Sequence, residues 1–229
     1  MSLASGPLLL LCGLGSDEDC WRDQANALGA TPLVAQGETI EAMAGDVLAR
    51  APPRFALAGH SMGGYIALAM MLAAPERVSR LALLNSSAAA DDETQRENRL
   101  RTIALLETAG LDPLVKVLPG MLSADRDVQD RMAAMLRRAG PARVIREHRA
   151  CMARPDRRDM LATIAVPALV IGSADDAIVP AHHAQTMAEA IPGARFVMLP
   201  QGGHMSIMAC ADRVTGLLRD WLGRSEPAT

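Results

Sequence analysis

Short apolar runs alternate with helix-like stretches along most of this chain. The runs of strand length are 8–12, 32–35, 55–58, 78–84, 168–171 and 195–199. The stretches between them with helical character are 17–28, 39–50, 65–74, 180–190 and 212–222. Strands that alternate with helices form parallel sheets, because each helix returns the chain to the same end of the sheet. We therefore predict an α/β fold with a doubly wound, mostly parallel sheet, and Ser16 is the expected N-cap of the first helix.

This alternation stops between residues 88 and 161. Helical stretches rich in charged residues take its place, at 92–108, 113–118, 125–139 and 141–153, and Gly and Pro residues separate them. The pattern predicts an all-helical insert over 88–161 within a core formed by 1–87 and 162–229. A chain of 229 residues suits one such domain with an inserted subdomain.

Composition limits the classes of function. The formal net charge is −3, which gives no reason to expect a nucleic-acid partner. No apolar run approaches the ~20 residues of a membrane span, and the run at 8–12 is too short for a secretion signal. The cysteines lack metal-ligand spacing, so we expect free thiols in a cytoplasmic protein, with no metal and no cofactor. Homo-oligomerisation is left open. The four cysteines are Cys12, Cys20, Cys151 and Cys210.

The segment Gly59-His60-Ser61-Met62-Gly63 carries the clearest chemical signal. It follows an apolar run of strand length and precedes a helix-like stretch. A serine held on a sharp turn between a strand and a helix is the nucleophile elbow, in which glycines relieve crowding around the turn. The segment therefore predicts that Ser61 is a nucleophile.

A serine nucleophile needs a histidine base, and the base needs an orienting acid. Among the five histidines, His204 follows the last core strand, where a loop would place it at the carboxyl edge of the sheet. We expect His60 to be structural, and His182 and His183 to be solvated. His148 lies in the insert and is a candidate for a contact with substrate.

The acid is expected after the penultimate core strand, where Asp175 and Asp176 are adjacent. The segment from Pro167 to Pro180 resembles the α/β-hydrolase superfamily, whose pattern here is Pro, strand, Gly-x-x-Asp, three residues and Pro. Counting from either proline selects Asp176, whereas counting from Gly172 selects Asp175. We predict Asp176 as the acid and a solvated loop position for Asp175.

The resemblance extends over nearly the whole chain. Residues 10–15 are similar to the loop that forms the oxyanion hole in this superfamily, with Cys12 in place of the common His and Trp21 at an expected aromatic position. The resemblance implies that the backbone N–H groups of Leu14 and Met62 bind the oxyanion. The superfamily's two N-terminal strands have no counterpart before residue 8, so about six strands are expected, with the first ones exposed or covered by a partner chain.

These features predict a serine esterase that acts on small to medium, uncharged carboxylic esters, with the insert as a lid. Few aromatic residues and 14 methionines favour an adaptable apolar pocket. One alternative with the same triad is a carbon–carbon hydrolase or a lyase of the menaquinone-pathway type, in which lid arginines grip a carboxylate. We expect most of the insert's arginines to be paired with acids or solvated. The other alternative is a non-catalytic ligand-binding homologue.

Overall fold

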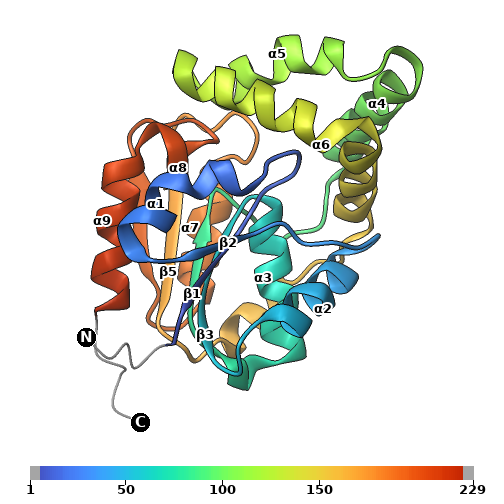
Figure 1. Ribbon diagram of the computed structural model, residues 1–229. Helices are drawn as coiled ribbons and strands as arrows, with labels where there is room; N and C mark the ends of the chain where they lie inside the picture. The colour runs from blue at the N-terminus through green and yellow to red at the C-terminus, as the bar shows by residue number, and fades with distance from the viewer. Residues whose placement is uncertain (1–5, 224–229) are drawn as a thin grey trace.

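Six strands form one sheet in the computed structural model, which describes residues 6–223. The strands are β1 (Leu8–Leu11), β2 (Thr31–Leu33), β3 (Phe55–His60), β4 (Val78–Leu84), β5 (Ala168–Ser173) and β6 (Arg195–Leu199). Their order is β2-β1-β3-β4-β5-β6, and all five neighbouring pairs are parallel (Figure 1). The predicted α/β class and the number of strands are confirmed.

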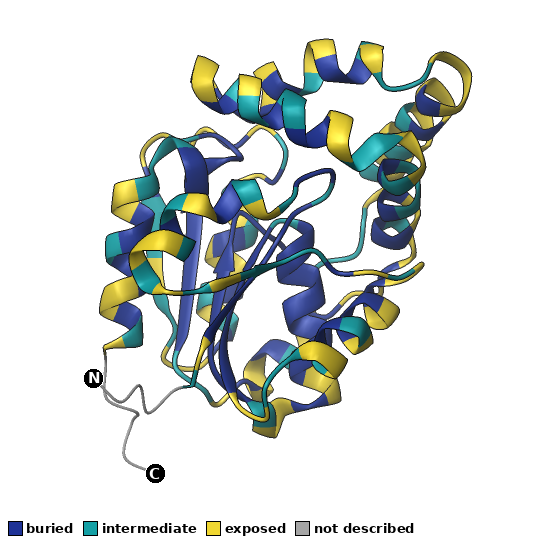
Figure 2. Ribbon diagram, in the orientation of Figure 1, coloured by how far each residue is buried: buried dark blue, intermediate teal, exposed yellow. Residues whose placement is uncertain are grey.

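Successive side chains of the central strands enter two different cores. Leu9 and Leu11 of β1 belong to one core and Leu8 and Leu10 to the other, since neighbouring residues of a strand point to opposite faces. The first core is covered by α2 (Ile40–Arg50), α3 (Met62–Ala73) and α7 (His182–Ala190). The second is covered by α1 (Arg22–Leu28), α8 (Ser206–Ala209) and α9 (Ala211–Leu222). This two-sided burial explains why most residues of the central strands are apolar (Figure 2).

The direction of chain progression reverses at β1. The chain moves outward from β1 to β2, and then crosses back to β3 and on to β6. Ligands bind at such a switch point, because the loops after the two strands separate there and leave a crevice at the carboxyl edge. The loop after β1 and the elbow after β3 flank this crevice.

Three helices lie between β4 and β5, and they cover the carboxyl edge of the sheet (Figure 1). They are α4 (Glu93–Ala109), α5 (Asp112–Leu122) and α6 (Arg126–Ala153). Gly140 interrupts α6 with a φ of 73°, outside the helical region, at the boundary predicted between two helical stretches. The helices share a small core of their own, which includes Leu106, Leu136 and Val144.

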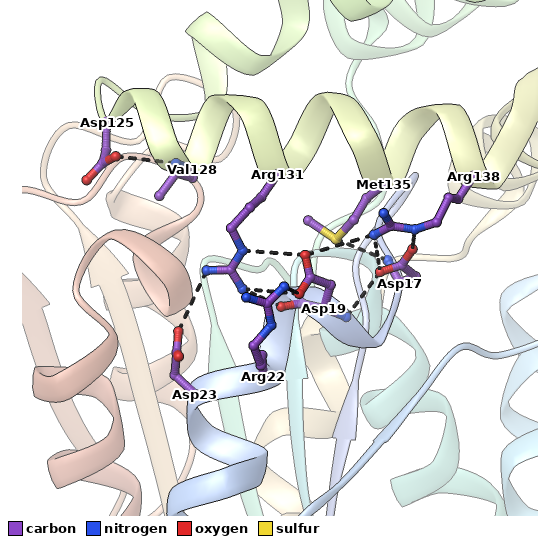
Figure 3. Close-up of polar contacts among 9 residues, drawn as sticks. All are labelled: Asp17, Asp19, Arg22, Asp23, Asp125, Val128, Arg131, Met135 and Arg138. Atoms are coloured by element: carbon purple, nitrogen blue, oxygen red, sulfur yellow. Dashed lines mark hydrogen bonds and ion pairs between the residues drawn. The ribbon is translucent and has the colours of Figure 1, made fainter.

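Ion pairs connect the first half of α6 to the segment after β1 (Figure 3). Arg138 Nε lies 2.7 Å from Asp17, and Arg131 Nη2 donates to the backbone carbonyl of Asp19 at 2.6 Å. Met135 Sδ accepts the backbone N–H of Asp17 at 3.5 Å. The insert is therefore fastened to the loop that borders the crevice.

Local predictions failed mainly at short elements. The first predicted helix is a 3-10 turn (Glu18–Trp21) followed by α1, and Asp17 caps it in place of Ser16, whose hydroxyl donates to the Gly13 carbonyl. Asp and Ser side chains both form hydrogen bonds with nearby backbone groups. The residue whose side chain reaches a free N–H at the start of the helix becomes the cap, and here that residue is Asp17. The four-residue α8, and the 3-10 turns Pro75–Arg77 and Arg158–Thr163, were not predicted.

All four cysteines are free thiols, and three of them are buried. Within residues 6–223, no helix combines the length and apolar character needed to cross a bilayer.

Candidate active site

The elbow places Ser61 in strained backbone between β3 and α3. Its φ of 53° and ψ of −119° lie in a region that L-residues rarely adopt, and strain of this kind concentrates at functional sites. A Cβ on Gly59 would collide with the backbone of Gly63, and a Cβ on Gly63 would collide with the carbonyl of Leu11. The two glycines are therefore required by the close approach of strand, turn and helix.

The structure brings Ser61, His204 and Asp176 together in one hydrogen-bonded chain. Ser61 Oγ lies 2.9 Å from His204 Nε2, and His204 Nδ1 lies 2.9 Å and 3.1 Å from the two carboxylate oxygens of Asp176. With Nδ1–H donating to the carboxylate, Nε2 keeps a lone pair that accepts the serine proton. This is the geometry that nucleophile, base and acid require.

Asp176 is held by donors in addition to His204. Its Oδ1 accepts the backbone N–H groups of Ile178 and Val179 at 2.8 and 2.9 Å, and its Oδ2 accepts Asn85 Nδ2 at 2.9 Å. Burial by itself would raise the pKa of Asp176, but the hydrogen bond from His204 and these further donors lower it below the ordinary value. The carboxylate is therefore ionised at neutral pH.

Asn85 is a supporting residue that the sequence patterns did not reveal. It follows β4 with a φ of 46°, and its amide also contacts Ser173 Oγ and the Gly203 carbonyl. Ser206 Oγ donates to its Oδ1 at 2.6 Å. The available signal was an Asn at the carboxyl end of a core strand, a position that collects polar site residues.

Asp175 has a more specific role than the solvated position predicted for it. The residue is exposed, yet its two carboxylate oxygens accept the backbone N–H groups of Gly202 and Gly203 at 3.2 and 2.9 Å. Gly203 directly precedes His204, so Asp175 holds the loop that carries the base. Asp176, the residue selected by counting from the flanking prolines, faces the imidazole of His204.

His60 is buried beneath the site, and its Nε2–H donates to the backbone carbonyl of His204 at 2.8 Å. Burial lowers the pKa of His60 to about 3, and the neighbouring His204 adds to the effect. The ring is therefore neutral at all ordinary pH values and positions the His204 backbone, in agreement with the structural role predicted for it.

The loop after β1 approaches the nucleophile closely. A Cβ on Gly13 would lie 3.2 Å from the Ser61 Cβ, and Leu14 and Met62 both line the adjoining cavity. Met62 is the first residue of α3, so its N–H has no acceptor within the helix. Trp21 Nε1 donates to the Leu11 carbonyl at 3.0 Å and fixes the end of β1.

The insert also contributes to this loop, through two residues that the sequence patterns missed. The buried Glu147 accepts the Gly15 N–H at 2.7 Å, and Arg143 Nη2 donates to the Ser16 carbonyl at 2.5 Å. Arg143 Nε pairs with Glu147 at 2.7 Å. The two residues lie four positions apart on α6, which predicts an ion pair within the helix. That spacing did not indicate that both side chains also bind the backbone of the loop after β1.

A cavity of about 500 Å³ opens over Ser61 between the core and the insert. Its walls include His148 of α6, which was singled out for a contact with substrate. His182 is exposed as predicted, whereas His183 is half-buried and hydrogen-bonded to Ser87 Oγ at 3.0 Å. Among the described residues, no group of three or more His, Cys, Asp or Glu side chains is arranged to hold a metal ion.

Known proteins resemble the chain over nearly its full length. Residues 51–209 match the family model described as alpha/beta hydrolase fold. The protein named "Putative carbamate hydrolase RutD" of Klebsiella pneumoniae is 31% identical, with coverage of 96% of this chain and 92% of that protein. The protein of the same name from Rhizobium rhizogenes is 31% identical, with 86% and 85% coverage.

Solved structures give the same assignment. An esterase from Thermogutta terrifontis has a TM-score of 0.85 and 28% identity, and covers 95% of this chain and 89% of its own. An enol-lactonase from Burkholderia xenovorans has a TM-score of 0.84 and 26% identity, with 98% and 94% coverage. The chain belongs to the α/β-hydrolase fold family. The names of these relatives and of the esterase with a similar structure assign the chain to the hydrolases.

Proposed function

We propose that this hydrolase is a serine esterase that cleaves carboxylic esters of small to medium acyl compounds through an acyl-enzyme. The observation that carries the proposal is the chain of hydrogen bonds from Ser61 through His204 to Asp176, at the floor of a cavity large enough for such a substrate. The esterase with a similar structure supports the same reaction class.

Each residue has a role in the proposed reaction. Ser61 Oγ attacks the ester carbonyl while His204 Nε2 takes its proton, and Asp176 stabilises the resulting imidazolium. The N–H groups of Leu14 and Met62 bind the oxyanion. His204 then protonates the departing alcohol, and afterwards removes a proton from the water that hydrolyses the acyl-enzyme.

The insert is proposed to act as the lid. Its helices complete the cavity wall and limit the access of water to the reacting carbonyl. The buried free thiols support the predicted cytoplasmic location, where a reducing environment keeps cysteines unpaired.

Carbamate hydrolysis is the second candidate, because relatives that cover most of this chain carry that description. A carbamate carbonyl can be attacked by the same serine, with a carbamoyl-enzyme in place of the acyl-enzyme. The triad geometry does not distinguish the two carbonyls. Carbon–carbon bond hydrolysis is the third candidate. It would use the same three residues and would also require cationic side chains that bind the carboxylate of an acidic substrate.

The test compares the purified protein with a Ser61→Ala variant on four substrates. These are p-nitrophenyl acetate, p-nitrophenyl butyrate, p-nitrophenyl N-methylcarbamate and an acidic vinylogous diketone. We expect the two esters to be turned over fastest, and the variant to lose that activity. Faster turnover of the carbamate would favour the second candidate, and turnover of the diketone alone would overturn the esterase proposal.

A further inference from the structure

The cavity has one polar wall, which a simple alkyl ester would not need. Gln95, Asn98, Arg99 and Thr102 of α4 line it, and their spacing of three, four and seven residues places them on one face of the helix. Arg101 also lines the cavity and is paired with Glu97. A second part of the wall is aliphatic and comes from α5, with Leu114, Val117, Leu118 and Met121. Polar groups that face a hydrocarbon ligand lose hydrogen bonds to water without replacement, so this wall indicates a polar part of the ligand.

Arg99 in the polar wall belongs to a buried ion-pair cluster with an excess positive charge. Arg99 Nε lies 2.7 Å from Asp91 Oδ2, and Arg154 Nη1 lies 2.5 Å from Asp91 Oδ1. Within residues 6–223, neither arginine pairs with another carboxylate. Two guanidinium groups and one carboxylate leave a formal charge of +1. The side chains of Asp91 and Arg154 are 3% and 4% exposed, so water screens this charge poorly.

The nearby carboxylate of Glu147 is paired with Arg143, and two further ionisable groups beside the arginines carry no charge at pH 7. Tyr65 and Cys151 lie beside the arginines, and burial raises the pKa of both, that of Cys151 to about 11. Both are therefore neutral at pH 7. The guanidinium of Arg154 lies over the Tyr65 ring at 4.1 Å, which holds it against the cavity wall.

His148 adds a donor without a partner. Arg99 Nη1 donates to His148 Nδ1 at 3.3 Å, so in the neutral ring the proton is on Nε2. Burial lowers the pKa of His148 to about 4, and Arg99 adds to the effect, so the ring is neutral. The residue is 9% exposed and lines the cavity, while its Nε2 atom is itself buried and has no hydrogen-bond partner among the described residues. A buried donor in this state is stabilised by an acceptor that a ligand brings.

We propose that Arg99 and the Nε2–H group of His148 bind a carboxylate on the substrate, separate from the ester that Ser61 attacks. A carboxylate supplies the single negative charge that the wall lacks and oxygen acceptors for both donors. The substrate class is thereby a half-ester of a dicarboxylic acid, in place of the uncharged ester expected from composition. The inference rests on the proposed function, because that function places the ester at Ser61.

The test compares monoethyl adipate with ethyl heptanoate, an uncharged ester of similar length, in a pH-stat. We expect the natural chain to prefer the half-ester. Arg99→Met should lower kcat/KM for the half-ester about tenfold or more through KM, and change ethyl heptanoate hydrolysis little. The variant leaves Asp91 paired with Arg154, so no buried carboxylate loses its only partner. His148→Leu should act in the same direction.

Arg96→Met is the matched control, because Arg96 is exposed on the same helix and lies outside the cavity wall. Equal preference for both esters in the natural chain, or equal loss of both in Arg99→Met, would overturn the inference and leave the esterase proposal intact. Calorimetric binding of monoethyl adipate to Ser61→Ala separates the two claims further. Arg99-dependent binding without turnover by the natural chain would retain the carboxylate site and reject the esterase.

Discussion

Asp175 and Asp176 divide the support of His204 between them. Asp176 contacts the imidazole, whereas Asp175 accepts two N–H groups of the loop that carries it. Asp176 is buried and has several donors, and Asp175 is exposed. The two neighbours therefore affect activity by different routes, one through the charge and tautomer of the base and the other through its position.

Replacing each aspartate by asparagine measures this division. Asp176→Asn should lower kcat for ester hydrolysis by about 10³ to 10⁴, because the amide cannot stabilise the imidazolium and favours the wrong tautomer. Asp175→Asn keeps one oxygen acceptor for the loop, so we expect a loss of about tenfold or less. Steady-state kinetics on p-nitrophenyl butyrate gives both values, and the reverse order would show that Asp175 is the acid.

Residues with a fixed place in a short pattern could be predicted, and residues that act across the fold could not. Ser61 was evident because its turn needs glycines on both sides, and His204 because it follows a strand end. Asn85 and Glu147 support the same site from positions distant in sequence. Their partners are a side chain and a backbone N–H that only the folded chain brings near.

At the scale of elements, α6 connects the insert to the proposed oxyanion loop at two levels. Its first half pairs with Asp17 and Asp19 (Figure 3). Its second half brings Arg143 and Glu147 to the loop. The break at Gly140 lets the two halves take different directions. The helix that covers the cavity thus also restrains the loop that carries Leu14.

Removing the acceptor for Gly15 should weaken oxyanion binding. Without Glu147 the loop shifts and the Leu14 N–H no longer points at the oxyanion, which is fully charged only in the transition state. Glu147→Ala is therefore expected to lower kcat about tenfold to a hundredfold with a small change in KM. Glu147→Gln retains an oxygen for the Gly15 N–H and should recover most of the activity. Kinetics on p-nitrophenyl butyrate tests this, and equal defects in both variants would assign the effect to the lost ion pair with Arg143.

The central strands could be predicted from sequence because burial on both faces leaves short runs of mostly apolar residues. The helices of the insert were also visible, although α5 begins one residue earlier and ends four residues later than the stretch 113–118. Pro119 lies within α5, where a proline normally indicates an end. The arrangement of these helices over the cavity depends on packing that has no local signature.

For the whole molecule, two buried neutral histidines link stability to pH. The pKa of His60 is lowered to about 3 and that of His148 to about 4, mainly by burial, from an ordinary value of 6.5. Between pH 6.5 and these lowered pKa values, both histidines bind protons in the unfolded chain but not in the folded chain. Acid therefore favours unfolding. Their contribution to stability is complete above pH 6.5 and is lost as the pH falls toward 4 and 3.

We therefore expect the free energy of unfolding to fall as the pH is lowered from 7.5 to 5. Each unit of separation between folded and unfolded pKa values contributes about 1.4 kcal/mol at most. Glu147 opposes the trend, because burial raises its pKa. Urea unfolding across this range measures the slope, which should be shallower in His148→Gln. A stability that is constant or rises toward pH 5 would contradict the prediction.

The central claim is that Ser61, activated by His204, forms a covalent intermediate. The most direct measurement is mass spectrometry of the folded protein after reaction with a fluorophosphonate, followed by peptide mapping. The account predicts one adduct, on the peptide that contains Ser61, absent in Ser61→Ala and formed far more slowly in His204→Ala. Folded protein that hydrolyses esters yet gains no adduct at Ser61 would contradict it.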